Sequence, residues 1–247
     1  MTETKRAALI TGSGRNIGKA TALRLAKDGF NVVINGSNDE RACDQVAAEA
    51  EQFGIEAVVV MGDIGVESQA NDIARQALEK FGTIDVLINN AAIRPAAGFL
   101  DISSAEWERV MAVDLTAAVW LSRACLPAMI KNNWGRIINF AGMNALQGYA
   151  SRPHVSVAKH GAWGLTKALS KEFGAQGITT NIISPGPISS DHDDPVMRAH
   201  IESQVSRIPL GRLGDPMEVA ATVSWLVSEP GAFVNGQLIQ VNGGAQT

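Results

Sequence analysis

The stretch Thr11-Gly-Ser-Gly-Arg-Asn-Ile-Gly18 decides the fold of this chain. It follows a short apolar run and precedes an amphipathic stretch, so its glycines stand where a strand turns into a helix. Glycine lets the backbone turn tightly and approach a pyrophosphate closely. The free N–H groups at the start of the helix then face that anion with the positive end of the helix dipole. We therefore expect a dinucleotide cradle at this turn.

Short apolar runs alternate with longer amphipathic stretches along the rest of the chain. The runs are rich in Val and Ile and lack polar alternation, which is typical of parallel strands buried on both faces. We expect strands at Ala7–Thr11, Val32–Asn35, Ala57–Met61, Val86–Asn89, Arg136–Phe140, Thr180–Ile183 and Leu238–Val241. We expect helices at Asn16–Gly29, Asp39–Phe53, Glu67–Phe81, Ser104–Asn132, Val155–Phe173 and Asp215–Val227. Right-handed crossovers then give a Rossmann-like, doubly wound α/β fold with about seven parallel strands and helices on both faces.

Composition excludes several classes of function. The net charge of −4 argues against nucleic acid as a partner. We find no apolar run of the ~20 residues that a membrane span needs, and we expect no signal peptide ahead of the first strand. Both cysteines, Cys43 and Cys125, fall in helical segments, where reduced thiols packed in the core are expected. We therefore expect a cytoplasmic protein with a single domain over residues 1–247.

The motifs of the chain resemble those of the short-chain dehydrogenase/reductase family. The glycine turn is similar to the family signature Thr-Gly-x-x-x-Gly-x-Gly, with Asn16 in place of the middle glycine. Four more segments match at the expected places along nearly the whole chain. They are Asp63-Ile64, Asn89-Asn-Ala-Ala92 (Ala92 replacing a usual glycine), Pro185-Gly-Pro-Ile188 followed by Ser190, and Asn242-Gly-Gly244.

The resemblance implies a set of residues that bind a nicotinamide dinucleotide. These are Gly12, Ser13, Arg15, Asn16, Ile17, Gly18, Asn35, Ser37, Asp63, Ile64, Asn90, Ala91, Ala92, Lys159, Pro185, Gly186, Ile188 and Ser190. A site that prefers NAD places an acid after the second strand, where it accepts from the ribose 2′-hydroxyl. Here the stretch reads Asn35-Gly-Ser-Asn38, and no acid occurs before Asp39. Arg15 can pair with a 2′-phosphate, so we favour NADP(H) and leave NAD(H) open.

The family's proton-transfer residues are mostly replaced. Relatives use Asn, Ser, Tyr and Lys, with Tyr and Lys four residues apart on one helix face. Lys159 matches the family lysine, but Val155 stands at the place of the tyrosine. Gly142 stands at the place of the serine and Asp114 at that of the asparagine. We expect Asp114 and Lys159 to form a buried salt bridge that serves binding or replaces the lost relay.

Two further residues are candidates for the missing acid. Tyr149 is the chain's one tyrosine and falls on the loop before the helix of Lys159. A packing aromatic in the pocket wall is the more frequent role for such a residue. His154 titrates near neutral pH, but it lies one position off the face of Lys159. A histidine at a helix start or on the surface is the more frequent interpretation.

The surroundings of the pocket suggest the kind of ligand. Arg94 and Arg152 should lie near its mouth, which favours an anionic small-molecule substrate, although each alone is more often a solvated side chain. The run Asp191-His-Asp-Asp194 looks like a metal cluster, but an acidic turn in solvent is more frequent, so we expect no metal. The irregular stretch around 186–214 is predicted to be a substrate lid.

Three functions remain open at this stage. The first is a divergent NAD(P)(H)-dependent oxidoreductase with non-standard proton transfer. The second is a non-redox lyase, hydratase or isomerase on the same scaffold, with Lys159 and Asp114 as base and acid. The third is a nucleotide-binding protein without turnover. In each case the resemblance implies a homo-oligomer, a dimer or tetramer.

Overall fold

A computed structural model describes residues 5–143, 147–190 and 203–247, and within them one parallel sheet forms the centre of the fold. The strand order is β3-β2-β1-β4-β5-β6-β7, and every pair of neighbours is parallel. The strands are β1 Ala7–Ile10, β2 Asn31–Ile34, β3 Ala57–Val59, β4 Val86–Asn89, β5 Gly135–Phe140, β6 Ile178–Pro185 and β7 Leu238–Val241. This confirms the predicted doubly wound sheet, with strand ends shifted by a few residues.

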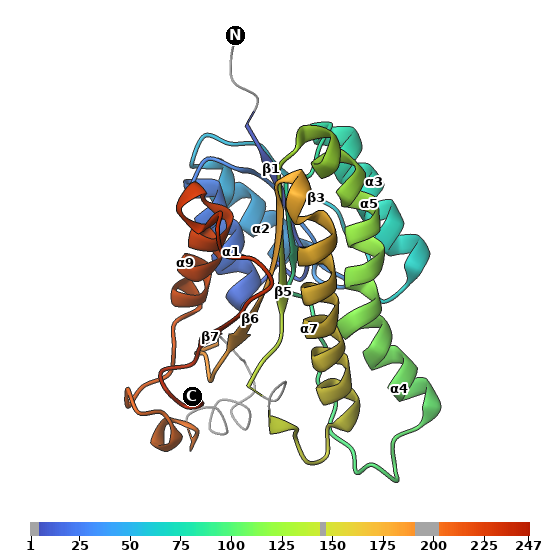
Figure 1. The fold of residues 1–247 in the computed structure, drawn as a ribbon, viewed down its shortest axis with the longest axis vertical. Helices are drawn as coiled ribbons and strands as arrows, with labels where there is room; N and C mark the ends of the chain where they lie inside the picture. The colour runs from blue at the N-terminus through green and yellow to red at the C-terminus, as the bar shows by residue number, and fades with distance from the viewer. Residues whose placement is uncertain (1–4, 144–146, 191–202) are drawn as a thin grey trace.

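Helices cover both faces of the sheet (Figure 1). One face carries α1 Asn16–Lys27, α2 Glu40–Glu51 and α9 Pro216–Val227. The other carries α3 Glu67–Phe81, α4 Ser104–Met111, α5 Ala117–Asn132 and α7 Pro153–Phe173. Short 3-10 turns lie at Gly174–Gln176, Val205–Arg207 and Glu229–Gly231.

The strands are buried because successive side chains enter two different cores. In β1, Ala8 and Ile10 pack with residues of α1, α2 and α9, whereas Ala7 and Leu9 pack with residues of α3 and α5. All four side chains of β1 are fully buried. Burial on both faces explains why the strands read as continuous apolar runs in the sequence.

The long helical stretch before β5 is interrupted at a position that matters for the site. We expected a single helix over 104–132, but a π-helical turn, Ala112–Thr116, separates α4 from α5. Such turns bulge a helix by one residue and are frequent at functional sites. Here the turn carries Asp114, which is buried.

The apolar stretch of that helical run belongs to the core. Ser104–Asn132 is long and apolar enough to cross a membrane by length and composition, yet half of its apolar window is buried inside the fold. The thiols of Cys43 and Cys125 are free and buried, as expected. Both observations are those of a core helix and packed core thiols.

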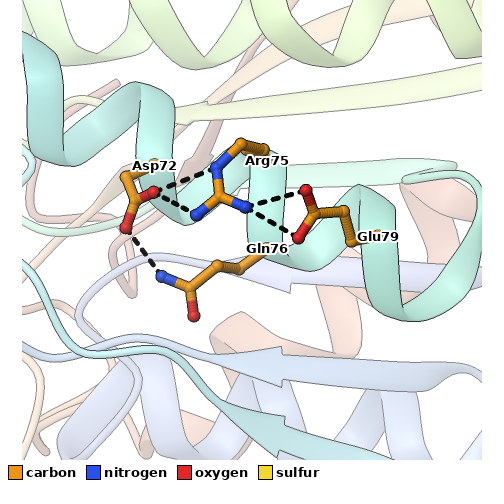
Figure 2. A network of polar contacts seen from close by, with 4 residues as sticks. All are labelled: Asp72, Arg75, Gln76 and Glu79. Carbon is orange, nitrogen blue, oxygen red and sulfur yellow. Dashed lines mark hydrogen bonds and ion pairs between the residues drawn. The ribbon is translucent and has the colours of Figure 1, made fainter.

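Exposed ion pairs lie on the solvent side of the outer helices. Figure 2 shows Arg75 of α3 between Asp72 and Glu79, with Gln76 donating to Asp72. These are i,i+3 and i,i+4 pairs on one helix face in solvent. Pairs of this kind contribute little to stability, because water and salt screen them.

Candidate functional site

The glycine turn after β1 has the geometry of an anion cradle. Gly12 lies at φ +63° and Asn16 at φ +50°, both in the left-handed region that favours glycine and asparagine. A Cβ added to Gly18 would lie 2.7 Å from Asn90 Nδ2 and 2.8 Å from Ser13 Cα, so no larger residue fits there. Arg15 precedes α1 without a side-chain hydrogen bond that caps the helix. The first N–H groups of α1 are therefore left for an external acceptor.

Residues after β4 hold this turn in place. Asn90 donates from Nδ2 to the carbonyl oxygens of Thr11 (2.9 Å) and Gly12 (3.1 Å). The Thr11 hydroxyl accepts from the N–H groups of Asn90 and Ala91. Ala91 packs so closely on Gly12 that an added Cβ there would lie 2.9 Å from the Ala91 Cβ. Ala92 follows as a partly buried residue. Asn90 and Ala91 thus brace the cradle with their own bonds.

At the predicted ribose end, Asn35 is hydrogen-bonded within the fold, whereas two other predicted side chains are exposed. Asn35 is buried, accepts from Gly12 N–H at 3.4 Å and donates to the carbonyl oxygens of Val60 and Gly62. Its side chain therefore joins β1, β2 and β3 rather than facing solvent. Arg15 and Ser37 are both exposed. A phosphate at that edge could reach them.

Two other predicted segments lie at the same edge of the sheet. Asp63 accepts from Gly65 N–H and forms an ion pair with Arg109 (2.7 Å), and Ile64 is buried beside it. After β6, the Gly186 N–H donates to the Val241 carbonyl, and Ile188 forms a bridge with Gly214. The Ser190 hydroxyl is buried without a hydrogen-bond partner.

These observations test the fit of a dinucleotide. The close-packed glycines, the helix start without a cap and the unpaired Ser190 hydroxyl are features that such a ligand would use. Ser13 and Ile17 complete the turn: the Ser13 hydroxyl donates to the Ile10 carbonyl, and Ile17 packs on the core. The residues present therefore fit a nicotinamide dinucleotide.

Lys159 and Asp114 form the buried ion pair that the sequence predicts. Lys159 Nζ lies 3.2 Å from Asp114 Oδ2, and both side chains are almost fully buried. Asp114 Oδ1 accepts from the Ile93 N–H at 2.8 Å. Burial lowers the pKa of Lys159, Asp114 opposes that lowering, and the charge of Arg94 adds to it. A lysine with a lowered pKa gives up its proton more readily than one in water.

A chain of buried amides leads to this pair, and the sequence analysis missed it. Asn89 at the end of β4 donates to Asn139 of β5 (2.9 Å), which in turn donates to the Thr166 hydroxyl of α7. Both asparagines interrupt apolar strand runs, which is the signal that could have singled them out.

A small cavity lies between these amides and the ion pair. Its volume is about 10 Å³, and its polar lining comes from Asn89, Asn139, Asp114 and Lys159. Asn89 Oδ1 is buried without a hydrogen-bond partner, and Asp114 Oδ2 has only its ion pair with Lys159. The volume is that of about one water molecule.

The positions of the replaced residues differ in their surroundings. Val155 is 3 % exposed and packs against Val110 and Ala158 of α4 and α7. By contrast, a Cβ added to Gly142 would meet no atom within 4 Å. The space around Gly142 is open, whereas the space around Val155 is filled with apolar atoms.

The two candidate substitute acids are held in different ways. Tyr149 is 40 % exposed, with the Arg152 guanidinium 5.2 Å from its ring centre. His154 is fully buried, so the expectation of a surface position was wrong, although it does lie at the start of α7. Its Nε2 lies 3.1 Å from Glu106 Oε1, and its ring stacks on Trp107.

The acidic run Asp191-His-Asp-Asp194 lies outside the described residues. Within the described ranges, no group of three or more His, Cys, Asp or Glu side chains could hold a metal ion. Of the predicted catalytic residues, Lys159 and Asp114 are brought together, whereas His154 contacts Glu106 and Tyr149 contacts Arg152.

Comparison with known proteins places this geometry in a family. Residues 12–246 match the family model described as enoyl-(acyl carrier protein) reductase. The chain is 36 % identical to a 3-oxoacyl-(acyl-carrier-protein) reductase of Synechocystis over 98 % of this chain and 97 % of that protein. It is 37 % identical to the (2S)-((R)-hydroxy(phenyl)methyl)succinyl-CoA dehydrogenase subunit BbsD of Thauera aromatica, covering 97 % of this chain and 96 % of that protein.

A solved structure agrees. Acetoin dehydrogenase YohF from Salmonella typhimurium superposes with a TM-score of 0.90 at 32 % identity, covering 97 % of this chain and 95 % of that one. Sequence, sheet order and glycine turn thus point to the same group, and the chain belongs to the short-chain dehydrogenase/reductase family.

Proposed function

We propose that the chain is a divergent NAD(P)(H)-dependent oxidoreductase in which Lys159 and Asp114 handle the proton that a tyrosine handles in relatives. The observation that carries the proposal is their buried ion pair, 3.2 Å apart, beside a cavity with unpaired polar atoms. Such a pair is costly to bury, and buried ionisable groups in a cleft are frequent where chemistry occurs.

The cofactor end supports the redox half of the proposal. When bound, the dinucleotide would supply or accept a hydride at its nicotinamide ring. The backbone of the turn from Gly12 to Gly18 and the start of α1 would hold its pyrophosphate. Exposed Arg15 and Ser37, with no acid between Asn35 and Asp39, favour NADP(H) over NAD(H).

The proposed proton transfer depends on Lys159. Because burial lowers the pKa of Lys159, its ammonium is a better acid near neutral pH than a lysine in solvent. One water in the cavity would accept from Lys159 and donate to Asn89 Oδ1 and Asp114 Oδ2. That arrangement satisfies three hydrogen bonds, the usual number for a buried water, and pairs the orphaned Asn89 Oδ1.

The names of the relatives support a small-molecule substrate. They describe reduction of a 3-oxoacyl or enoyl thioester, and oxidation of acetoin or of a hydroxyl group on a succinyl-CoA. Each places the reacting group at a carbonyl, a carbinol or a double bond conjugated to a carbonyl. A substrate of this chain would carry one of these groups.

Three wider features stay predictions. A homo-oligomer, dimer or tetramer, is supported by exposed apolar side chains on α5 and α7, such as Ile130 and Val157, and its mass in solution would test it. A substrate lid over 186–214 is supported by a cavity of about 290 Å³ bordered by Ile188 and Leu210. A cytoplasmic location is supported by two free thiols.

The test separates binding from turnover. Titration with NADPH and with NADH, followed by nucleotide fluorescence, should saturate, with NADPH binding more tightly. Nucleotide deuterated at C4 should then pass deuterium to substrates that carry a carbonyl or a conjugated double bond, and Lys159→Met should abolish this transfer without abolishing NADPH binding. Saturation without transfer to any carbonyl or enoyl substrate would favour the nucleotide-binding protein, and conversion without deuterium transfer the lyase or isomerase. Absence of saturation would reject the proposal.

A further inference from the structure

Two arginines from different loops meet beside the Lys159–Asp114 pair. Arg94 follows Ile93, whose N–H donates to Asp114 Oδ1 at 2.8 Å. Arg152 directly precedes α7, the helix that carries Lys159. The Ala97 N–H donates to the Ser151 carbonyl at 2.9 Å, which ties the two loops together. The backbone therefore brings both arginines to the same side of the site.

Neither arginine has an anionic partner among the described residues. No ion pair within 4 Å involves Arg94 or Arg152 in that part of the chain, whereas Arg75 and Arg212 are each paired with carboxylates. Arg152 Nε is buried without a hydrogen-bond partner, and its guanidinium lies over the ring of Tyr149. A buried donor without an acceptor is costly unless a ligand supplies one.

The charges around the pair are unbalanced. Arg94 keeps contact with solvent, although the protein atoms around its guanidinium lower its pKa by desolvation. Asp114 opposes that lowering and the like charge of Arg152 adds to it, so the two guanidinium groups repel each other. Arg94 and Lys159 both interact with one carboxylate, Asp114, which is already paired with Lys159. An anion bound between the arginines would balance the excess of positive charge.

We propose that Arg94 and Arg152 bind a carboxylate of the substrate, placed close to its reacting carbon. The proposal rests on the proposed function, because it names the substrate class of the same site. Guanidinium groups match a carboxylate with two parallel hydrogen bonds, and an aromatic ring under one of them fixes its plane. The substrate would be a short organic acid that carries a carbonyl, hydroxyl or conjugated double bond near the carboxylate.

The position of the arginines argues against a phosphate of an acyl carrier. The charge of Arg94 acts on the pKa of Lys159, so the anion site lies within electrostatic reach of the lysine. A pantetheine arm would hold its phosphate far from the reacting carbonyl, outside this site. A carboxylate a few bonds from the reacting carbon fits instead.

The test measures binding without turnover. Succinate is titrated into the protein by calorimetry, with succinamide as the neutral counterpart and inorganic phosphate as the other anion. We expect saturable binding of succinate and none of succinamide. Arg94→Gln and Arg152→Gln should each weaken the binding of succinate at least about tenfold. Arg152→Lys should weaken it less, because lysine keeps the positive charge. Arg75→Gln, an exposed residue of α3 that is paired with Asp72 and Glu79, is the matched control and should bind as the parent does.

Several results would overturn the inference. Unchanged succinate binding in Arg94→Gln and Arg152→Gln would do so, and so would equal binding of succinamide. Phosphate that binds more tightly than succinate and is lost in the same variants would reject a carboxylate in favour of a carrier phosphate. Circular dichroism of each variant checks its folding. Because succinate is titrated both with and without NADPH, a failure of nucleotide binding is seen separately from a failure of the anion site.

Discussion

The cofactor end and the catalytic end of the molecule differ in what holds them. At the glycine turn the functional groups are backbone N–H groups, and what the sequence supplies is mainly the absence of side chains at Gly12 and Gly18. Around Lys159 the functional groups are side chains, and three of the four positions that we match to the family pattern carry other residues. A site built from backbone is changed only by disturbing the fold, whereas a site built from side chains changes one residue at a time.

The largest effect on cofactor binding is expected from Gly18→Ala, which tests the cofactor end. The new Cβ would lie 2.7 Å from Asn90 Nδ2 and also meet Gly12, so the turn must open. Overpacking costs about 1–3 kcal/mol, which at its upper end weakens NADPH binding on the order of 10²-fold. Fluorescence titration measures this. Gly164→Ala in α7, whose Cβ would meet nothing within 4 Å, is the control and should stabilise by about 0.5–1 kcal/mol. Equal NADPH affinity in both variants would contradict the cradle.

The largest effect on stability is expected from breaking the ion pair of the catalytic end. Lys159→Met leaves the Asp114 carboxylate buried and uncompensated, which costs about 3–5 kcal/mol in the free energy of unfolding. The double variant with Asp114→Leu should recover most of that loss, because both charges are then absent. Urea denaturation gives these values.

The exposed network of Figure 2 provides the comparison for that measurement. Arg75→Gln removes ion pairs that lie in solvent, so the urea midpoint should stay within experimental error. A loss in Arg75→Gln as large as that in Lys159→Met would show that burial of the Lys159–Asp114 pair is not what matters.

A smaller effect is expected from restoring the family residues. Gly142→Ser meets no atom of the described residues, but Gly142 lies at φ +158°, a backbone conformation that other residues rarely adopt, so the change should cost on the order of 1 kcal/mol. Val155→Tyr must displace the apolar cluster around Val110 and should cost about 1–3 kcal/mol. If the scaffold is otherwise intact, the double variant should reduce neutral ketones with NADPH about 10²–10⁴-fold faster than the parent, as a positioned acid does. An unchanged rate in a folded double variant would mean that the pocket differs beyond these two positions.

The smallest effect is the pH dependence of the lysine. Burial places the pKa of Lys159 in the folded state below its unfolded value. Between the two values the unfolded chain holds a proton that the folded chain lacks, so this contribution to stability rises with pH until about 10.4 and is smallest at neutral pH. The slope is at most about 1.4 kcal/mol per pH unit. Urea midpoints at pH 8, 9 and 10, relative to Asp114→Leu with Lys159→Met, should show it. If the stability difference between the parent and the double variant falls as the pH rises, the pKa of Lys159 is not lowered in the folded state.

The sequence predicted those parts of the structure that follow from local pattern. The strands and their parallel direction followed from apolar runs separated by helices, and the pairing of Asp114 with Lys159 followed from the match to family positions. The roles of Asn35 and His154 could not be predicted. Asn35 binds the backbone carbonyls of Val60 and Gly62, just after β3 and more than twenty residues away, and His154 contacts Glu106 and Trp107 of α4. Such long-range contacts leave no local signal.

The contacts of the amides from Thr166 to Asn89 are long-range as well. The two asparagines stand out as polar residues in apolar runs, but only the register of β4 with β5, which pairs Asn89 with Asn139, brings them together. Register is set by the whole sheet rather than by either strand.

The burial of both thiols has a practical consequence for labelling. Burial raises the pKa of Cys125 to about 12, and burial together with nearby acids, Asp39 first, raises that of Cys43. Only thiolates react with maleimides at useful rates, so the native chain should be inert to them at neutral pH. A cysteine introduced at Leu100, whose side chain is 94 % exposed, would then accept a single fluorophore without any prior removal of native cysteines.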